Sequence, residues 1–263
     1  MKVEMSLREH IEELRVRMLR VALSIVIITI FAMTFDLRPI EVGGLPLVYP
    51  YPDPIHNISA RLTFFMQDAL LPPEVELIQT APGQAFFAQI HVSALIGLTA
   101  SIPLIVREIS AFIAPAIGTK TKIGLVNVFL PAVGLFATGI AFAYLLVIPY
   151  ALDFLYSYGE ALNVVTFLTI NDFISFVMQF FLGFGVAFQL PILMYGISLT
   201  DVVSPRFWRD NFRYALIILV VFGAIITPDG SGVTMWFVAG PMIGLYLAGM
   251  LIVERRAASK TNT

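Results

Sequence analysis

Acidic and basic side chains gather near the start of the sequence, and they are the groups best suited to bind a charged partner. Residues 9–17 read Glu-His-Ile-Glu-Glu-Leu-Arg-Val-Arg. The acidic residues of this segment make it a candidate contact site for a basic peptide, because a carboxylate can accept charge-assisted hydrogen bonds from a guanidinium group. Apolar residues recur at helical spacing (Leu7, Ile11, Leu14, Met18), which predicts an amphipathic helix. The alternative is a helix on the membrane surface with salt bridges between residues four positions apart.

Four polar residues lie within or beside long apolar runs: Gln84, His91, Gln189 and Asp229. Polar side chains are costly in lipid, so each one needs a structural or functional reason. A neutral glutamine such as Gln189 most often forms hydrogen bonds between helices. Contact with a membrane partner is the functional alternative for all four.

The sequence offers no constellation typical of an enzyme. It contains no cysteine, and its three histidines lack the spacing of metal ligands. It also lacks a nucleotide-binding loop, a nucleophile elbow and an HExxH motif. We therefore expect no cofactor, no metal site and no catalytic residues. The net charge of −2 gives no reason to expect nucleic-acid binding.

Composition shows which environment must position these side chains. Hydrophobic residues make up 58% of the 263 residues and charged residues only 13%, against about 25% charged in an average soluble protein. The mean hydropathy is +0.87. Too few charges are present to cover a globule of this size in water. The chain is therefore predicted to be an integral membrane protein formed of a single domain, residues 1–263.

Runs without charged residues predict an all-α polytopic fold with six transmembrane helices. The expected helices are residues 17–35, 80–107, 123–149, 171–197, 213–228 and 233–253. The fifth run is only about 22 Å long as a helix, which is short for a membrane span. Residues 36–79 form the one long connection; it is rich in proline, with a short helix expected within residues 55–71. Two pairs of small residues are spaced for close helix packing: Gly183 with Ala187, and Gly240 with Gly244.

The distribution of lysine and arginine predicts the orientation of these helices. With six spans, 14 of the 16 basic residues fall in the termini and in the second and fourth connections. Only Arg38 and Arg61 fall on the other side. Because basic residues collect on the cytoplasmic side, both termini are expected in the cytoplasm.

Five motifs occur in the order found in one family. They are Glu-His-Ile-Glu-Glu-Leu-Arg-Val-Arg at 9–17, Phe-Ile-Ala-Pro-Ala at 112–116, Phe-x-x-Gly-x-x-Phe-x-Tyr-x-x-Val-x-Pro at 136–149, Phe-Gly-Val-Ala-Phe-Gln-Leu-Pro at 184–191 and Thr-Pro-Asp at 227–229. Together they closely resemble the C subunit of the twin-arginine protein translocase, TatC. The resemblance covers nearly the whole chain and implies a concave, glove-like cup of six helices, with helices five and six too short to span the membrane.

The resemblance also implies a function. The family is a receptor for the twin-arginine signal peptides of folded proteins, and it recruits single-helix TatA- and TatB-type partners for export driven by the proton-motive force. It is not known as an enzyme. The implied location is the prokaryotic cytoplasmic membrane, in a larger complex with self-association of the subunit. Two other classes remain: a small-solute secondary transporter, which should show a charged midplane site, and an intramembrane enzyme.

Residue by residue, the resemblance assigns the signal-peptide site to Glu13, Arg15, Arg17, Phe112 and Pro115. The family has a second acidic residue where this sequence has Thr121. That departure places a two-carboxylate site in question, and Glu108 is the leading substitute because it precedes Phe112 by one helical turn. The family's charged residues in helices two and four correspond to Gln84, His91 and Gln189 here, which keep hydrogen bonding without a charge.

Overall fold

The computed structural model describes residues 7–42, 45–72, 75–117, 125–164, 167–199, 203–204, 206–227 and 230–261. They group into two compact units, each described by itself. The first unit comprises residues 1–69, 77–112 and 169–174, and the second comprises residues 70–76, 113–168 and 175–263.

Two long helices and a β-hairpin form most of the first unit. Its elements are α1 (Leu7–Thr34), β1 (Phe35–Val42), β2 (Leu45–Pro52), α2 (Ile58–Leu70), β3 (Leu77–Ile78) and α3 (Gln84–Ile117). The expected surface helix and first span are one continuous helix, α1. The short helix expected within residues 55–71 is confirmed as α2.

Helices also dominate the second unit. Its elements are α4 (Leu125–Phe142), the π-helix η1 (Ala143–Val147), α5 (Ile148–Ala161), β4 (Leu168–Thr169), most of α6 (Ile170–Ala187), α7 (Leu190–Leu199), α8 (Phe207–Asp210), α9 (Phe212–Ile226) and α10 (Gly232–Thr261). The expected third span is α4, η1 and α5 run together, and the expected fourth span is divided into α6 and α7.

The apolar helices have the lengths that a membrane protein requires. Within the described residues, five helical stretches are long and apolar enough to cross a bilayer: Arg8–Thr34, Gln84–Ile109, Phe129–Ala161, Ile170–Ser198 and Gly232–Ala258. The helix Phe212–Ile226 is apolar but shorter. These helices confirm the prediction of an all-α polytopic membrane protein.

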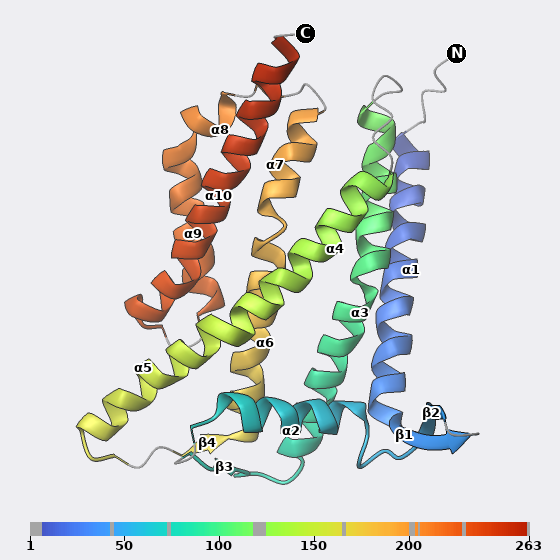
Figure 1. Cartoon of the computed structure of the whole chain (residues 1–263), viewed down its shortest axis with the longest axis vertical. Coiled ribbons are helices and arrows are strands. Elements are labelled where there is room, and N and C mark those ends of the chain that lie inside the picture. The colour runs from blue at the N-terminus through green and yellow to red at the C-terminus, as the bar shows by residue number, and fades with distance from the viewer. Residues whose placement is uncertain are drawn as a thin grey trace. The chain divides into compact units, whose positions relative to one another are not determined.

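Close contact between α1 and α3 holds the first unit together. A Cβ atom at Gly97 would lie 2.7 Å from the carbonyl oxygen of Ile25, so only glycine permits this approach. Nearby, the hydroxyls of Ser24 and Ser101 lie 2.9 Å apart and share a hydrogen bond between the two helices. Small residues and interhelical hydrogen bonds replace the hydrophobic effect as the cause of packing in lipid. The N-terminal end of α1 therefore lies beside the C-terminal end of α3 (Figure 1).

A row of phenyl rings forms the centre of the second unit. Phe180 and Phe184 of α6 and Phe188, directly after its end, follow one another every four residues, and the ring centroid of Phe142 lies 5.5 Å from that of Phe184. A Cβ atom at Gly139 would lie 2.6 Å from the Phe184 carbonyl oxygen, so α4 approaches α6 at backbone distance. Tilted ring pairs of this kind add to the packing energy of the buried surface.

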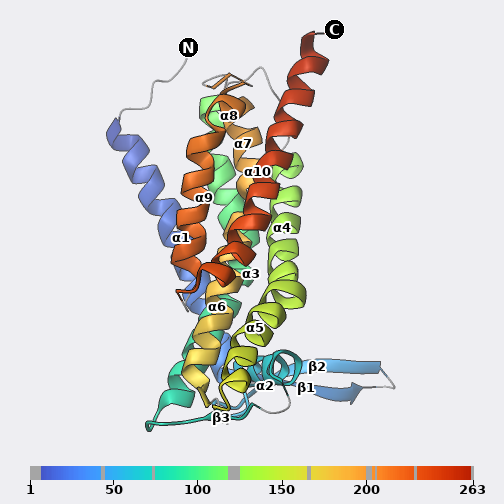
Figure 2. The same cartoon turned by 90° about the vertical axis from the view of Figure 1, so that its left-hand side faces the viewer.

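The proline-rich connection of the first unit folds into a regular hairpin, which the sequence analysis did not foresee. β1 and β2 pair antiparallel over eight residues each, from Phe35 opposite Pro52 to Val42 opposite Leu45. The hairpin and α2 lie crosswise at the C-terminal end of α1 (Figures 1 and 2). Asn57 fixes this corner: its side-chain amide donates to the Met33 carbonyl at 2.7 Å, and its carbonyl accepts the Ala60 N–H at the start of α2.

Candidate functional site

An ionic cluster joins the N-terminal part of α1 to the C-terminal part of α3. The Arg17 guanidinium donates to Glu13 through Nε at 3.0 Å and Nη2 at 2.6 Å. The same group donates to Glu108 Oε2 through Nη1 at 2.7 Å. One planar cation thus bridges two carboxylates, a geometry suited to arginine because its donors form a rigid fork. We refer to Glu13, Arg17 and Glu108 as the arginine bridge.

Each member of the arginine bridge is placed by its helix. Glu13 and Arg17 are one turn apart on α1, so their side chains meet on one face. Glu108 arrives from α3 and is nearly buried, with a side-chain exposure of 6%, whereas Glu13 reaches the surface at 23%. Glu108 was predicted from the sequence as a substitute for the second acid. In the structure Glu108 pairs with Arg17 and lies beside Glu13.

Each carboxylate of the arginine bridge keeps one oxygen that is only weakly engaged by the described residues. Glu13 Oε2 lies 4.0 Å from His10 Nδ1, which is beyond hydrogen-bond distance. Glu108 Oε1 lies 3.7 Å from Arg20 Nη1, and the Arg20 side chain is 59% exposed. Oxygens in this state can accept further charge-assisted hydrogen bonds. The arrangement can therefore bind additional guanidinium groups.

An aromatic pair borders the arginine bridge. The rings of His10 and Phe112 stack with their centroids 4.4 Å apart and an interplanar angle of 21°. This contact again joins α1 to α3. It gives the charged site an apolar edge, against which the apolar part of a peptide can pack.

The other residues predicted for the peptide site differ in their surroundings. Arg15 is 69% exposed and pairs with Glu12 at 3.4 Å, so it lies on the surface outside the arginine bridge. The side chain of Pro115, and the whole of Thr121, lie outside the described residues. The sequence analysis missed His10 and Arg20, although the spacings of His10 with Glu13 and of Arg17 with Arg20 correspond to one helical turn.

The polar residues singled out within the apolar runs do not form one site. Gln189, at the break between α6 and α7, donates to the Ala132 carbonyl of α4 at 3.1 Å, as expected of a residue that links helices. Gln84 begins α3 and accepts the Thr80 N–H at 3.0 Å. His91 has a buried Nδ1 without a hydrogen-bond partner among the described residues. Asp229 lies outside the described residues.

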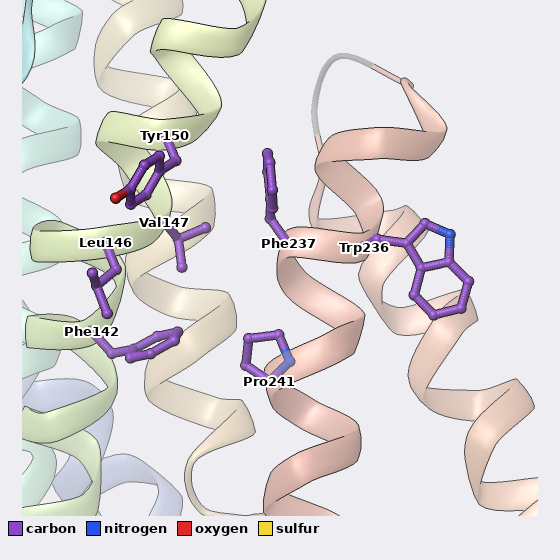
Figure 3. Close-up of a pocket in the computed structure, with 7 residues that line it drawn as sticks. All are labelled: Phe142, Leu146, Val147, Tyr150, Trp236, Phe237 and Pro241. Carbon is purple, nitrogen blue, oxygen red and sulfur yellow. The ribbon is translucent and has the colours of Figure 1, made fainter.

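An apolar groove of about 300 Å³ lies within the second unit. Phe142, Leu146 and Tyr150, from α4, η1 and α5, face Phe237 and Pro241 of α10 across it (Figure 3). The described residues that line it are mostly apolar, so the groove is suited to apolar chains.

A second ionic network ties the hairpin to α2 at the opposite end of α1. Asp36 is buried and receives Arg61 Nε on Oδ1 at 2.7 Å and Arg61 Nη2 on Oδ2 at 3.0 Å. Its Oδ1 also accepts the Leu37 N–H, and its Oδ2 accepts Arg38 Nε. Burial alone would raise the pKa of Asp36, but the hydrogen bonds from Arg61 and Arg38 outweigh it and hold that pKa below its usual value. We refer to Asp36, Arg38, Asp53 and Arg61 as the hairpin network.

Asp53 completes the hairpin network. Its Oδ1 accepts the backbone N–H groups of His56 and Ile55, and its Oδ2 accepts Arg38 Nη2 at 3.0 Å. The backbone hydrogen bonds, that of the His56 N–H first and then that of the Ile55 N–H, lower the pKa of Asp53 although burial opposes them. Arg38 also lies over the ring of Tyr51, 3.9 Å from its centroid.

Comparisons with known proteins identify the family to which the chain is similar. The family model for the Sec-independent protein translocase protein (TatC) matches residues 9–241. The TatC protein of Cenarchaeum symbiosum is 54% identical over 254 residues, which is 96% of each chain, and that of Aquifex aeolicus is 31% identical over 92% of each chain. A crystal structure of the twin arginine translocase receptor TatC superimposes with a TM-score of 0.77 at 28% identity, covering 94% of this chain and 98% of that one.

These matches confirm the resemblance drawn from the five motifs. The family is a transport family without an enzymatic activity, and its members work with other Tat subunits. The long apolar helices, the sequence relatives and the structural match all lead to one conclusion: this chain belongs to the TatC family of Sec-independent protein translocase proteins, as a multi-pass membrane component of a twin-arginine translocase.

Proposed function

We propose that the arginine bridge is the place where this chain binds the paired arginines of a twin-arginine signal peptide. The observation that carries this proposal is the spare oxygen on each of two neighbouring carboxylates, Glu13 and Glu108. One peptide guanidinium binds Glu13 Oε2, and the other binds Glu108 Oε1 in place of the exposed Arg20. The stacked rings of His10 and Phe112 support the apolar part of the peptide.

Arg17 has a positioning role in this proposal. Without it, two carboxylates would face each other with one of them nearly buried, and their repulsion would move them apart. By taking one oxygen of each, Arg17 holds both acids at a fixed spacing and leaves the other oxygens for the peptide. The site is therefore preorganised for two guanidinium groups although Thr121 replaces the family's second acid.

The same geometry favours arginine over lysine in the peptide. A guanidinium presents several donors in one plane, whereas an ammonium group is a point charge with stronger hydration. A pair of lysines therefore makes fewer hydrogen bonds to oxygens already oriented by Arg17.

Crosslinking tests the location of the site. A photoreactive phenylalanine analogue at Phe112 should capture a twin-arginine peptide, and excess unlabelled peptide should compete. The same analogue at Phe86 is the matched control, because Phe86 is an exposed phenylalanine at the other end of α3. Equal capture at both positions, or capture of a twin-lysine peptide as efficient as that of the twin-arginine peptide, would exclude the arginine bridge as the site.

We propose further that both termini face the cytoplasm of a prokaryotic cell, which places the arginine bridge where signal peptides arrive. The support is the distribution of basic residues, 14 of 16 on one side for six spans. Since the chain has no cysteine, Asp53→Cys and Ser259→Cys each give a single labelling site. In intact cells an impermeant reagent should label the first and not the second. Labelling of both from outside would refute this orientation.

Partner recruitment completes the proposed function. We assign the chain a role in assembling TatA- and TatB-type single-helix proteins, in a complex with further copies of itself, for export driven by the proton-motive force. The short helix α9 supports this role, because a row of its apolar side chains is exposed: Ile217, Ile218, Val221 and Ile225. Gln189 carries no charge, so a titrating carboxylate at that position has no part here. Copurification of a single-helix partner, lost on replacing Ile218 and Ile225 by alanine, tests this assignment.

A further inference from the structure

The β1–β2 hairpin begins and ends at the C-terminal end of α1, a helix long and apolar enough to cross a membrane. β1 begins at Phe35, the residue directly after the membrane helix α1. At the end of β2, the Asp53 N–H donates to the Thr34 carbonyl at 3.0 Å. Both ends of the hairpin are therefore held at the last residue of a membrane helix, and the strands extend crosswise to that helix (Figures 1 and 2).

The two faces of the hairpin differ in composition near its base. Side chains alternate along each strand, so the register places Phe35, Leu37, Val48 and Pro50 on one face. Asp36, Arg38, Tyr49 and Tyr51 lie on the other face. Toward the tip, Glu41 lies on the first face, and Ile40, Val42, Leu45 and Leu47 lie on the second. We call the basal parts of the two faces the apolar face and the charged face.

Two contacts show how these faces are placed relative to α1 and α2. The ring of Phe35, on the apolar face, stacks on Phe31 with centroids 4.9 Å apart. Phe31 lies one turn earlier in α1, which is nearer the centre of the bilayer. On the charged face, Asp36 pairs with Arg61 of α2. The apolar face therefore continues an exposed apolar side of α1, on which Ile27 and Phe31 lie.

Prolines prevent the hairpin from pairing with a further strand. Residues opposite one another alternate between pairs that exchange hydrogen bonds and pairs whose N–H groups point outward. One of these two sets of pairs contains four prolines: Pro39, Pro46, Pro50 and Pro52. Because proline has no N–H to exchange across the pair, this is the set whose backbone groups point away from the partner strand. A fifth residue of this set, Leu37, donates its N–H to the Asp36 side chain and not to a neighbouring strand. The hairpin edges therefore offer few donors, and its faces are the surfaces available for contact.

We propose that the apolar face of the β1–β2 hairpin lies on the lipid bilayer, in the interfacial layer of the leaflet where α1 ends. Leu37 and Val48 are 39% and 62% exposed, and they adjoin prolines that carry no polar side-chain group. The bilayer is the surface from which the chain has just emerged, so contact with it extends an existing interface. Tyr49 and Tyr51 then lie at the level of the headgroups, where tyrosine is enriched.

Spin labelling of single cysteines in liposomes tests this placement. Val48→Cys and Tyr49→Cys are adjacent and exposed on opposite faces, so each is the matched control of the other. For each spin label, the rate of collision with oxygen, which concentrates in lipid, is compared with the rate of collision with a water-soluble nickel complex. Ile30→Cys, on the exposed side of α1, calibrates the value for a label in lipid.

The label at Val48 should be several-fold more accessible to oxygen than to nickel, and the label at Tyr49 should show the reverse ratio. Leu37→Cys provides a second reading of the apolar face. Nickel accessibility at both Val48 and Leu37 would overturn the proposal, because the hairpin would then stand in water. Protection from both reagents, or spin–spin broadening that grows with protein density, would also overturn it, because a protein partner or a second copy would then cover this face.

Discussion

The two ends of α1 each carry acids bridged by arginines, yet the hydrogen bonding of their carboxylates differs. In the hairpin network, both oxygens of Asp36 and both oxygens of Asp53 accept hydrogen bonds at 3.3 Å or less. In the arginine bridge, Glu13 Oε1 and Glu108 Oε2 are bound tightly, and the ionic contact of the second oxygen with the described part of the chain is 4.0 Å for Glu13 and 3.7 Å for Glu108. We call the hairpin network closed, because every carboxylate oxygen in it accepts a close hydrogen bond. We call the arginine bridge open, because one oxygen of each carboxylate does not do so among the described residues.

This difference separates a structural role from a binding role for similar residues. A carboxylate whose oxygens are all engaged has no acceptor left for a ligand, and it stabilises the loop that surrounds it. A carboxylate with a spare oxygen near the surface binds a further cation at little cost in reorganisation. The numbers of acids and arginines alone do not distinguish the two ends.

The largest expected effect follows from removing the cation of the arginine bridge. Arg17→Ala leaves the nearly buried Glu108 without its close partner, and breaking a buried pair costs about 3–5 kcal/mol. We expect the lower part of that range for the free energy of unfolding, because Glu13 reaches water. The measurement is unfolding in mixed micelles. Arg15→Ala is the control, since its exposed pair with Glu12 contributes about 0–1 kcal/mol; equal losses in the two variants would contradict a buried bridge.

The next largest effect compares the two ends directly. Glu13→Ala should weaken binding of a twin-arginine peptide by about 1.5–3 kcal/mol, the value of a hydrogen bond to a charged group. Partial exposure of Glu13 reduces the loss toward the lower figure. Asp36→Asn should leave peptide affinity unchanged, because the hairpin network is closed. Fluorescence anisotropy of labelled peptide measures both, and an unchanged affinity of Glu13→Ala would remove Glu13 from the site.

A smaller gain is expected from restoring the family's second acid. Thr121→Glu places a carboxylate between Lys120 and Lys122. It should tighten peptide binding by about 0–1 kcal/mol, as for an exposed ion pair. The gain should be greater in a Glu108→Gln background, where the spare oxygen of the arginine bridge has lost its charge. If Glu108→Gln alone leaves affinity untouched, Glu13 is the one strong acidic contact.

The smallest effect is a pH dependence of the closed end. The pKa values of Asp36 and Asp53 are lowered in the folded protein. Their stabilisation is therefore fully present above the unfolded-state pKa and is lost as the pH falls through the folded-state value. Thermal unfolding between neutral and strongly acidic pH should show a steeper loss for the wild type than for Asp36→Asn. Parallel curves would show that Asp36 contributes no pH-dependent stability.

Local sequence patterns determined much of this protein. Long apolar runs and few charges predicted the membrane helices, since a bilayer accepts little else. The segment 9–17 predicted the salt bridge between Glu13 and Arg17, because residues one turn apart meet on the same face of a helix. The five motifs identified the family. These inferences succeed because each depends on residues close together in the sequence.

Tertiary structure decided what depends on residues far apart. The pairing of Arg17 with Glu108 joins positions 91 residues apart, and no spacing rule predicts it. The open and closed states of the two ionic clusters depend on distances of a few tenths of an ångström between separate elements. Glycine spacing shows the same limit: Gly183 packs against Ile226, whereas no atom of the described residues lies within 4 Å of a Cβ atom built at Gly240 or Gly244. The sequence marks where close approach is allowed, and only the fold determines which surface approaches.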